Sequence, residues 1–106
     1  MSMDMNLMMK QMQQMQAEME RLQTEAAAEI VEASAGGGMV TVKANGAREI
    51  VSVQVKPEAI DPSDPEMLED LVLAAANEAL RSADRMLQAK LGSLMGGLGD
   101  LRIPGL

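Results

Sequence analysis

Apolar residues in the first third of the chain recur at alternating spacings of four and three residues. The stripe consists of Met1, Met5, Met8, Met12, Met15, Met19, Leu22 and Ala26. This heptad pattern is typical of a coiled-coil helix, and Gln, Glu, Lys and Arg fill most of the other positions. No glycine or proline precedes Gly36, so we predict a helix over residues 3–28, about 39 Å long at 1.5 Å per residue.

A helix of this length cannot bury its whole apolar stripe against a small domain. A second copy of the chain is the simplest partner that would bury the rest. We therefore expect a homodimer interface formed by Met5, Met8, Met12, Met15, Met19 and Leu22. Unbranched methionine also adapts to irregular partners. An adaptor or chaperone-like dimer that captures a protein is accordingly the alternative interpretation of the stripe.

The hydrophobic period changes to two in the middle of the chain. Valines alternate with polar residues in two stretches, which predicts strands over residues 39–44 and 48–55. Residues 30–35 have the composition of a first strand, joined to the next by three glycines. The three segments predict an antiparallel meander, with one apolar face that another element must cover.

The dipeptide Asn45-Gly46 favours a two-residue type I′ turn between the second and third strands. Such a turn would pair Val40 with Val51 and gather the valines on one face. The same register would place the basic side chains of this segment on the opposite face. These are Lys43, Arg48 and Lys56.

Three prolines between residues 56 and 65 predict a loop, which leads into a second helix over residues 64–95. The apolar face of that helix is broader than a coiled-coil seam, so we expect it to pack against the sheet and another helix. The fold class is thus α+β, with one domain over residues 1–95 and a flexible, glycine-rich tail over residues 96–106.

Acidic residues at the start of the second helix allow two interpretations. Asp61, Asp64 and Glu66 could hold a hard cation such as Mg²⁺. Alternatively, they satisfy free N–H groups at the helix start, where Ser63 and Glu66 have capping-box spacing and Asp61 is a rival cap. Helix capping is the preferred interpretation, and no metal or cofactor is expected.

Composition excludes several classes of function. The 106 residues carry a net charge of -7 and include 12 Met but no His, Cys, Phe, Trp or Tyr. This excludes disulfides, Cys/His metal sites, catalysis by His or Cys, and aromatic stacking on bases. No apolar run is nearly as long as a membrane-spanning segment, and the first residues lack the pattern of a signal peptide. We expect a cytoplasmic binding protein without enzymatic activity, a small-molecule substrate or a membrane partner.

The basic residues differ in how their neighbours compensate them. Arg21 has acidic residues three positions before and four after it, and Arg81 is flanked in the same way at three residues on either side. Arg85 and Lys90 are less compensated, and Lys10 has no acidic residue three or four positions away. These cations either lie on a solvated face or bind phosphates, and composition alone favours the solvated face.

The motifs in the middle of the chain resemble the YbaB/EbfC family of bacterial nucleoid-associated proteins. The resemblance rests on the run GGGMVTVKANG from Gly36, on Asp61-Pro62, and on EMLEDLVLAAANEAL from Glu66. The Met- and Gln-rich first helix and the closing Ile103-Pro104-Gly105-Leu106 also look like that family. The resemblance covers essentially the whole chain.

The resemblance implies a tweezer-like homodimer with helical arms that binds double-stranded DNA with little sequence preference in the nucleoid. It also points to a link with recombination or repair. Family contacts to DNA are usually placed on the first and last helices, which implies Lys10, Arg21, Arg81, Arg85 and Lys90. With the three sheet cations Lys43, Arg48 and Lys56, these form the expected phosphate-binding set.

Overall fold

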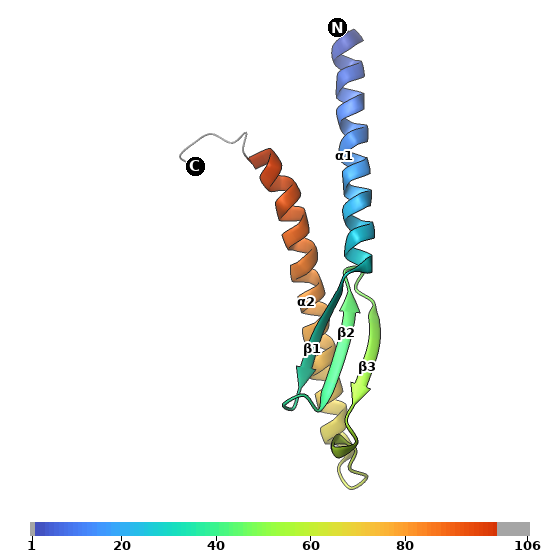
Figure 1. Ribbon diagram of the computed structural model, residues 1–106, viewed down its shortest axis with the longest axis vertical. Helices are drawn as coiled ribbons and strands as arrows, with labels where there is room; N and C mark the ends of the chain where they lie inside the picture. The colour runs from blue at the N-terminus through green and yellow to red at the C-terminus, as the bar shows by residue number, and fades with distance from the viewer. Residues whose placement is uncertain (1, 100–106) are drawn as a thin grey trace.

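The computed structural model describes residues 2–99 and the side chains of residues 4–95. Its elements are α1 (Ser2–Ala28), β1 (Ile30–Ala35), β2 (Val40–Asn45), β3 (Ile50–Val55), the 3₁₀ helix η1 (Pro57–Ala59) and α2 (Pro65–Gly99). The predicted α+β fold is confirmed. The particle is elongated, 74 × 30 × 16 Å, because α1 extends away from the sheet as an arm while α2 packs on the sheet (Figure 1).

Several element boundaries differ from the sequence prediction by one to four residues, and β3 begins at Ile50 and not at residue 48. The short helix η1 lies within the predicted loop, and α2 continues to Gly99, four residues beyond its expected end at residue 95. Glycine is a poor helix former but does not forbid a helix, so Gly96 and Gly97 were no reliable stop signal. The rest of the predicted tail, residues 100–106, lies outside the described residues.

The core lies between β2 and one face of α2. The sheet is an antiparallel meander with β2 in the centre, and Val42 lies between Ala33 of β1 and Val53 of β3. The fully buried core residues are Val40, Val42, Ala44, Ala75, Ala79 and Ala83. The alanines of α2 recur every four residues, so they form a smooth ridge that lets the helix approach the strand closely.

The third strand is left uncovered by this arrangement. Residues Val42 and Val53 are cross-strand partners on the same face, yet Val42 is 0% exposed and Val53 is 49% exposed. The reason is that α2 packs on β1 and β2 and scarcely reaches β3. Ile50 and Val51 of the same edge strand are also exposed.

The β2–β3 connection is not the predicted two-residue turn. Asn45 pairs with Glu49 across a three-residue loop, and Arg48 has the positive φ of 63° that such a loop requires. The side-chain Oδ1 of Asn45 accepts hydrogen bonds from the N–H groups of Ala47 (2.9 Å) and Glu49 (3.2 Å). The predicted register was therefore wrong: Val40 pairs with Val55, and a bulge accommodates the extra residue near Val51.

Gly46 is needed for a close approach between two segments of backbone and not for a positive φ. Its N–H donates a hydrogen bond to the carbonyl oxygen of Ala26, 2.8 Å away at the end of α1. A Cβ at this position would lie 2.5 Å from that oxygen. The loop thus satisfies a free carbonyl of the helix end and holds the base of the arm against the sheet.

The start of α2 is capped by Asp64, one of the three acidic residues expected to satisfy free N–H groups there, and not by Ser63 or Asp61. Oδ1 of Asp64 accepts a hydrogen bond from the N–H of Met67 at 3.3 Å, with Pro65 in the first helical position. Asp61 instead closes the preceding turn by accepting hydrogen bonds from Ser63. These bonds, mainly the one from the Ser63 hydroxyl, lower the pKa of Asp61.

The heptad stripe of α1 is divided between two environments. Its last residues pack within the chain, where Leu22 and Ala26 are buried and Met19 is half-buried. Its first described residues are far more exposed: Met5 66%, Met8 61%, Met12 70% and Met15 47%. In Figure 1 this upper part of α1 stands apart from α2.

Candidate nucleic-acid interface

Eight basic residues lie in the described part of the chain, and all eight belong to the predicted phosphate-binding set. Five of them form ion pairs with carboxylates of the same chain: Arg21, Arg48, Arg81, Arg85 and Lys90. The eight residues are spread over both helices, the sheet and its connections, so the structure does not bring them together into one continuous positive strip.

Two arginines one helical turn apart on α2 share a single carboxylate. Nε of Arg81 is 3.0 Å from Oε2 of Glu78, and Nη2 of Arg85 is 2.7 Å from Oε1. The two guanidinium groups lower the pKa of Glu78, mainly through the hydrogen bond from Arg85. Both arginine side chains are 61% exposed, and together with Glu78 they carry a net positive charge. We call Arg81 and Arg85 the arginine pair.

The pairing of Arg85 with Glu78 corrects the expectation that Arg85 is less compensated than Arg81. Glu78 precedes it by seven residues, which places the two side chains on the same face two helical turns apart. A search at a spacing of seven would have found this contact. Arg85 also donates a hydrogen bond to Oγ of Ser82 at 3.0 Å, so its position on the helix is well defined.

In contrast to the arginine pair, negative charges outnumber positive ones around Arg21 on α1. Its two terminal nitrogens lie 2.6 Å from Glu18 and 2.8 Å from Glu25, as the sequence spacing predicted. The hydrogen bond from Arg21 to Glu18 is the main cause that raises the pKa of Arg21. Two carboxylates surround one cation here, so this part of the arm has a net negative charge.

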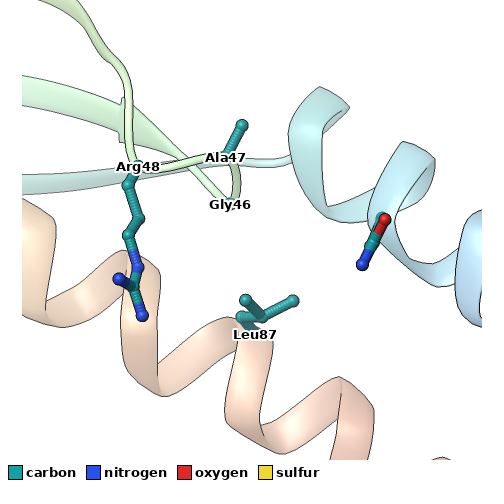
Figure 2. Close-up of a pocket in the computed structure, with 5 residues that line it drawn as sticks. Gly46, Ala47, Arg48 and Leu87 are labelled. Atoms are coloured by element: carbon teal, nitrogen blue, oxygen red, sulfur yellow. The ribbon is translucent and has the colours of Figure 1, made fainter.

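Arg48 does not share the outer sheet face with Lys43, contrary to prediction. Its side chain extends from the β2–β3 loop toward α2 (Figure 2). There Nε of Arg48 lies 2.6 Å from Oδ1 of Asp84. Together with Gly46, Ala47, Gln23 and Leu87 it borders an open hollow of about 340 Å³ between the loop and both helices. The three-residue loop causes this change of face, because the predicted two-residue loop would have kept strand alternation up to Arg48.

Lys90 connects the two helices near the base of the arm. Its Nζ lies 2.7 Å from Oε2 of Glu29, just beyond the end of α1. The hydrogen bond to Glu29 is the main cause that raises the pKa of Lys90. Only 25% of the Lys90 side chain is exposed, so it is the least accessible of the paired cations.

Lys10, Lys43 and Lys56 have no ion-pair partner among the described residues. They are far apart in the fold: Lys10 lies on the arm, Lys43 lies on the sheet face away from α2, and Lys56 follows β3. The partners Lys43 and Ser52 confirm that this sheet face is polar, as predicted.

Negative charge is concentrated at the end of the molecule opposite the arm. Residues 57–70 contain six acidic residues and no basic one. They are Glu58, Asp61, Asp64, Glu66, Glu69 and Asp70. We call this segment the acidic end. It lies beside η1 and the start of α2, below the sheet in Figure 1.

Within the described residues, no three acidic side chains are grouped so that they could hold a metal ion. No helix in residues 2–99 is long and apolar enough to cross a membrane. What the described residues present is an arm, a charged helix and an open sheet edge, an arrangement that defines a binding module.

Comparison with known proteins identifies the family of this module. The family model described as the YbaB/EbfC DNA-binding family matches residues 1–98, so the chain belongs to that family. It is 55% identical over 101 residues to a nucleoid-associated protein of Acetivibrio thermocellus, covering 95% of this chain and 88% of the relative. It is 54% identical over 103 residues to a nucleoid-associated protein of Pelotomaculum thermopropionicum, covering 97% and 95%.

A solved structure shares the fold. The crystal structure of an uncharacterized protein from Helicobacter pylori superposes with a TM-score of 0.73 at 22% identity, covering 83% of this chain and 92% of that one. At this level of identity, the similarity supports the architecture alone.

Proposed function

We propose that this protein is an architectural component of the bacterial nucleoid in the cytoplasm, and that it binds duplex DNA through phosphates with little sequence preference. The match of residues 1–98 to a DNA-binding family is the observation that carries this proposal. A link to recombination or repair is proposed from the family resemblance alone.

The arginine pair is the best-placed phosphate contact. An exposed ion pair contributes little to stability in water, so a phosphate can compete with Glu78 for either guanidinium. Arginine has five N–H donors, and Arg81 uses only Nε for Glu78, which leaves its terminal nitrogens free for a second acceptor. Further proposed contacts are Lys10 on the arm, Lys43 on the sheet, Lys56 after β3 and Arg48 in the β2–β3 loop. Arg21 and Lys90 are weaker candidates, because one has two carboxylate neighbours and the other is mostly covered.

The distribution of acidic residues explains how an anionic chain can bind DNA. The acidic end repels phosphates, while the arginine pair lies farther along α2 on the side of the arm. Repulsion between charges farther apart than about 8–10 Å is largely screened at physiological salt. DNA would therefore approach from the arm side, with an affinity that falls steeply as salt increases.

We also propose that the protein is a homodimer, because the exposed face of β3 needs a cover. The uncovered apolar edge of a three-stranded sheet is prone to pair with another chain in solution. A second copy of this protein is the simplest partner that would cover it. Two chains would double the number of arginine pairs offered to one duplex, and linked contacts strengthen weak individual ones.

The dimer proposal predicts that Val53→Glu converts the protein to a monomer. A charge introduced at this half-exposed position would be buried against the partner without a counter-ion. Sedimentation equilibrium measures the change. Gln54→Glu adds the same charge on the other face of β3 and should leave the dimer intact. A dimer that survives Val53→Glu would contradict the β3 interface.

The DNA proposal predicts a smaller salt dependence for the double variant Arg81→Gln, Arg85→Gln. Each lost phosphate contact lowers the slope of log K against log salt by about 0.9, so the expected decrease is about 1.8 per chain in contact. Fluorescence anisotropy with a labelled duplex over a salt series measures it. Weaker DNA binding by this variant is not expected if the protein is only an adaptor that uses its methionines.

The comparison variant for this experiment is Lys56→Gln, which removes a further proposed contact and should cost less DNA binding per charge than the loss of the arginine pair. It removes one positive charge from the wild-type chain. The charge lost lies next to the acidic end and not on the part of α2 nearer the arm. An equal loss per charge in this variant would show that net charge or the sheet cations, and not the arginine pair, govern binding.

A further inference from the structure

The upper part of α1 is an exposed apolar surface that the proposed function does not use. We call residues 5–17 the arm tip. Its seam residues Met5, Met8, Met12 and Met15 are the most exposed part of the heptad stripe, and no other described element packs over them. An apolar seam of this length on one helix normally has a partner helix.

The charge of the tip favours a second copy of the same segment. The chain as a whole carries -7, so two copies repel each other over most of their surface. Residues 5–17 contain one charged residue, Lys10, and it lies on the side of the helix away from the seam. The tip is thus a segment where two anionic chains can approach with neither repulsion nor the burial of a charge.

The spacing of the seam is symmetric, so two copies can pair along it in an antiparallel arrangement. The spacings between positions 5, 8, 12 and 15 are three, four and three residues, so they are symmetric about the midpoint at residue 10. Two antiparallel tips centred there would pair Met5 with the partner's Met15 and Met8 with the partner's Met12. In heptad terms these are contacts between a and d positions, so all four seam residues are used.

The burial pattern fits the length of this overlap. In the antiparallel arrangement, Asp4 of one chain lies opposite Gln16 of the other. The overlap therefore ends just before Met19, where the stripe begins to be covered by its own chain. The two sheets then lie at opposite ends of the pair and do not collide. Lys10 stays on the outer side of each helix, free to contact phosphate.

We propose that the arm tips of two molecules associate as an antiparallel helical pair centred on Lys10. This association is distinct from the dimer contact through β3. Because a pair of tips this short is weak alone, it would be populated chiefly where molecules are concentrated. If the protein binds DNA as proposed above, paired tips would join molecules on separate duplex segments.

The absence of cysteine from the sequence permits a direct test by disulfide trapping without DNA. The variants Met5→Cys and Met15→Cys are prepared, one of them labelled with ¹⁵N, and oxidised alone and as a mixture. In the proposed pair, Met5 of one chain lies opposite the partner's Met15, whereas two copies of residue 5 are about 15 Å apart along the axis. Disulfides require Cα atoms within about 7 Å, so the mixture should cross-link at least about tenfold faster than either variant alone.

The matched control is the mixture of Asn6→Cys with Gln14→Cys. These positions have the same axial register but lie off the seam, so they should cross-link slowly. Rapid linkage of Met5→Cys with itself, or equal rates for seam and control mixtures, would overturn the proposal. Salt-dependent DNA binding is measured separately and is unaffected by either result.

A second measurement does not depend on cysteine. Replacing Met8 and Met12 with Glu should abolish the concentration-dependent association beyond the dimer, as seen by sedimentation velocity. Asn6→Glu with Gln13→Glu adds the same charge off the seam and should preserve it. A wild-type protein that shows no association beyond the dimer at millimolar concentration would also overturn the proposal.

Discussion

Gly46→Ala is expected to destabilise the protein by about 1–3 kcal/mol, the range for inserting atoms where there is no space. The new Cβ would lie 2.5 Å from the carbonyl oxygen and 2.6 Å from the Cβ of Ala26. Ala26 is itself buried and fixed in the last turns of α1, so the loop or the helix must move. Either movement breaks the hydrogen bond of 2.8 Å that joins them. A urea titration at fixed protein concentration measures the loss.

The same substitution should also loosen the arm. Hydrogen exchange in the last turns of α1 should become faster, because Gly46 holds that helix end against the sheet. Gly92→Ala is the matched control. It lies in α2 with no other atom close to the added Cβ, so alanine should stabilise the helix by about 0.5–1 kcal/mol. If both substitutions change stability in the same direction, the close approach at Gly46 is not important for the fold.

Gly46 also illustrates why the hairpin could not be predicted from its own residues. The Asn-Gly dipeptide is a strong local signal for a two-residue turn, and in this chain it led to a wrong register. The glycine is required by a contact with Ala26, twenty residues earlier in the chain. Only the tertiary structure places those two residues together.

The two helices, by contrast, were largely predictable because their signals are local. The heptad stripe and the lack of helix breakers predicted α1 to within one residue at its start. The existence of three strands followed from alternation, and the Gly36–Gly38 turn from glycine's tolerance of positive φ.

The candidate site was predictable only where partners lie on the same helix. Spacing predicted the ion pairs of Arg21 with both of its acidic neighbours and of Arg81 with Glu78. Asp84, the other expected neighbour of Arg81, pairs with Arg48 instead. The contacts of Lys90 with Glu29 and of Arg48 with Asp84 join different elements. No pattern along the chain indicates such pairs, so the sequence overestimated how many cations are free.

Ala79→Leu is expected to cause a loss of stability of similar size, about 1–3 kcal/mol or more, because α2 lies close to β2 along its alanine ridge. Ala79 is fully buried between Ala75 and Ala83 in the cluster that contains Val40 and Val42. A leucine adds three carbon atoms at the point of closest approach, so α2 must move away from the sheet or adopt strained side-chain conformations.

Ala74→Leu provides the matched control for that experiment, since Ala74 is exposed on the same helix and leucine is nearly as good a helix former as alanine. It should change stability little. The midpoint of chemical denaturation compares the two variants. Because moving α2 would also displace the arginine pair, Ala79→Leu should weaken DNA binding even at temperatures where the chain stays folded. A stable Ala79→Leu protein would mean that the helix and the strand can separate without cost, and the core described here would not be what holds α2 in place.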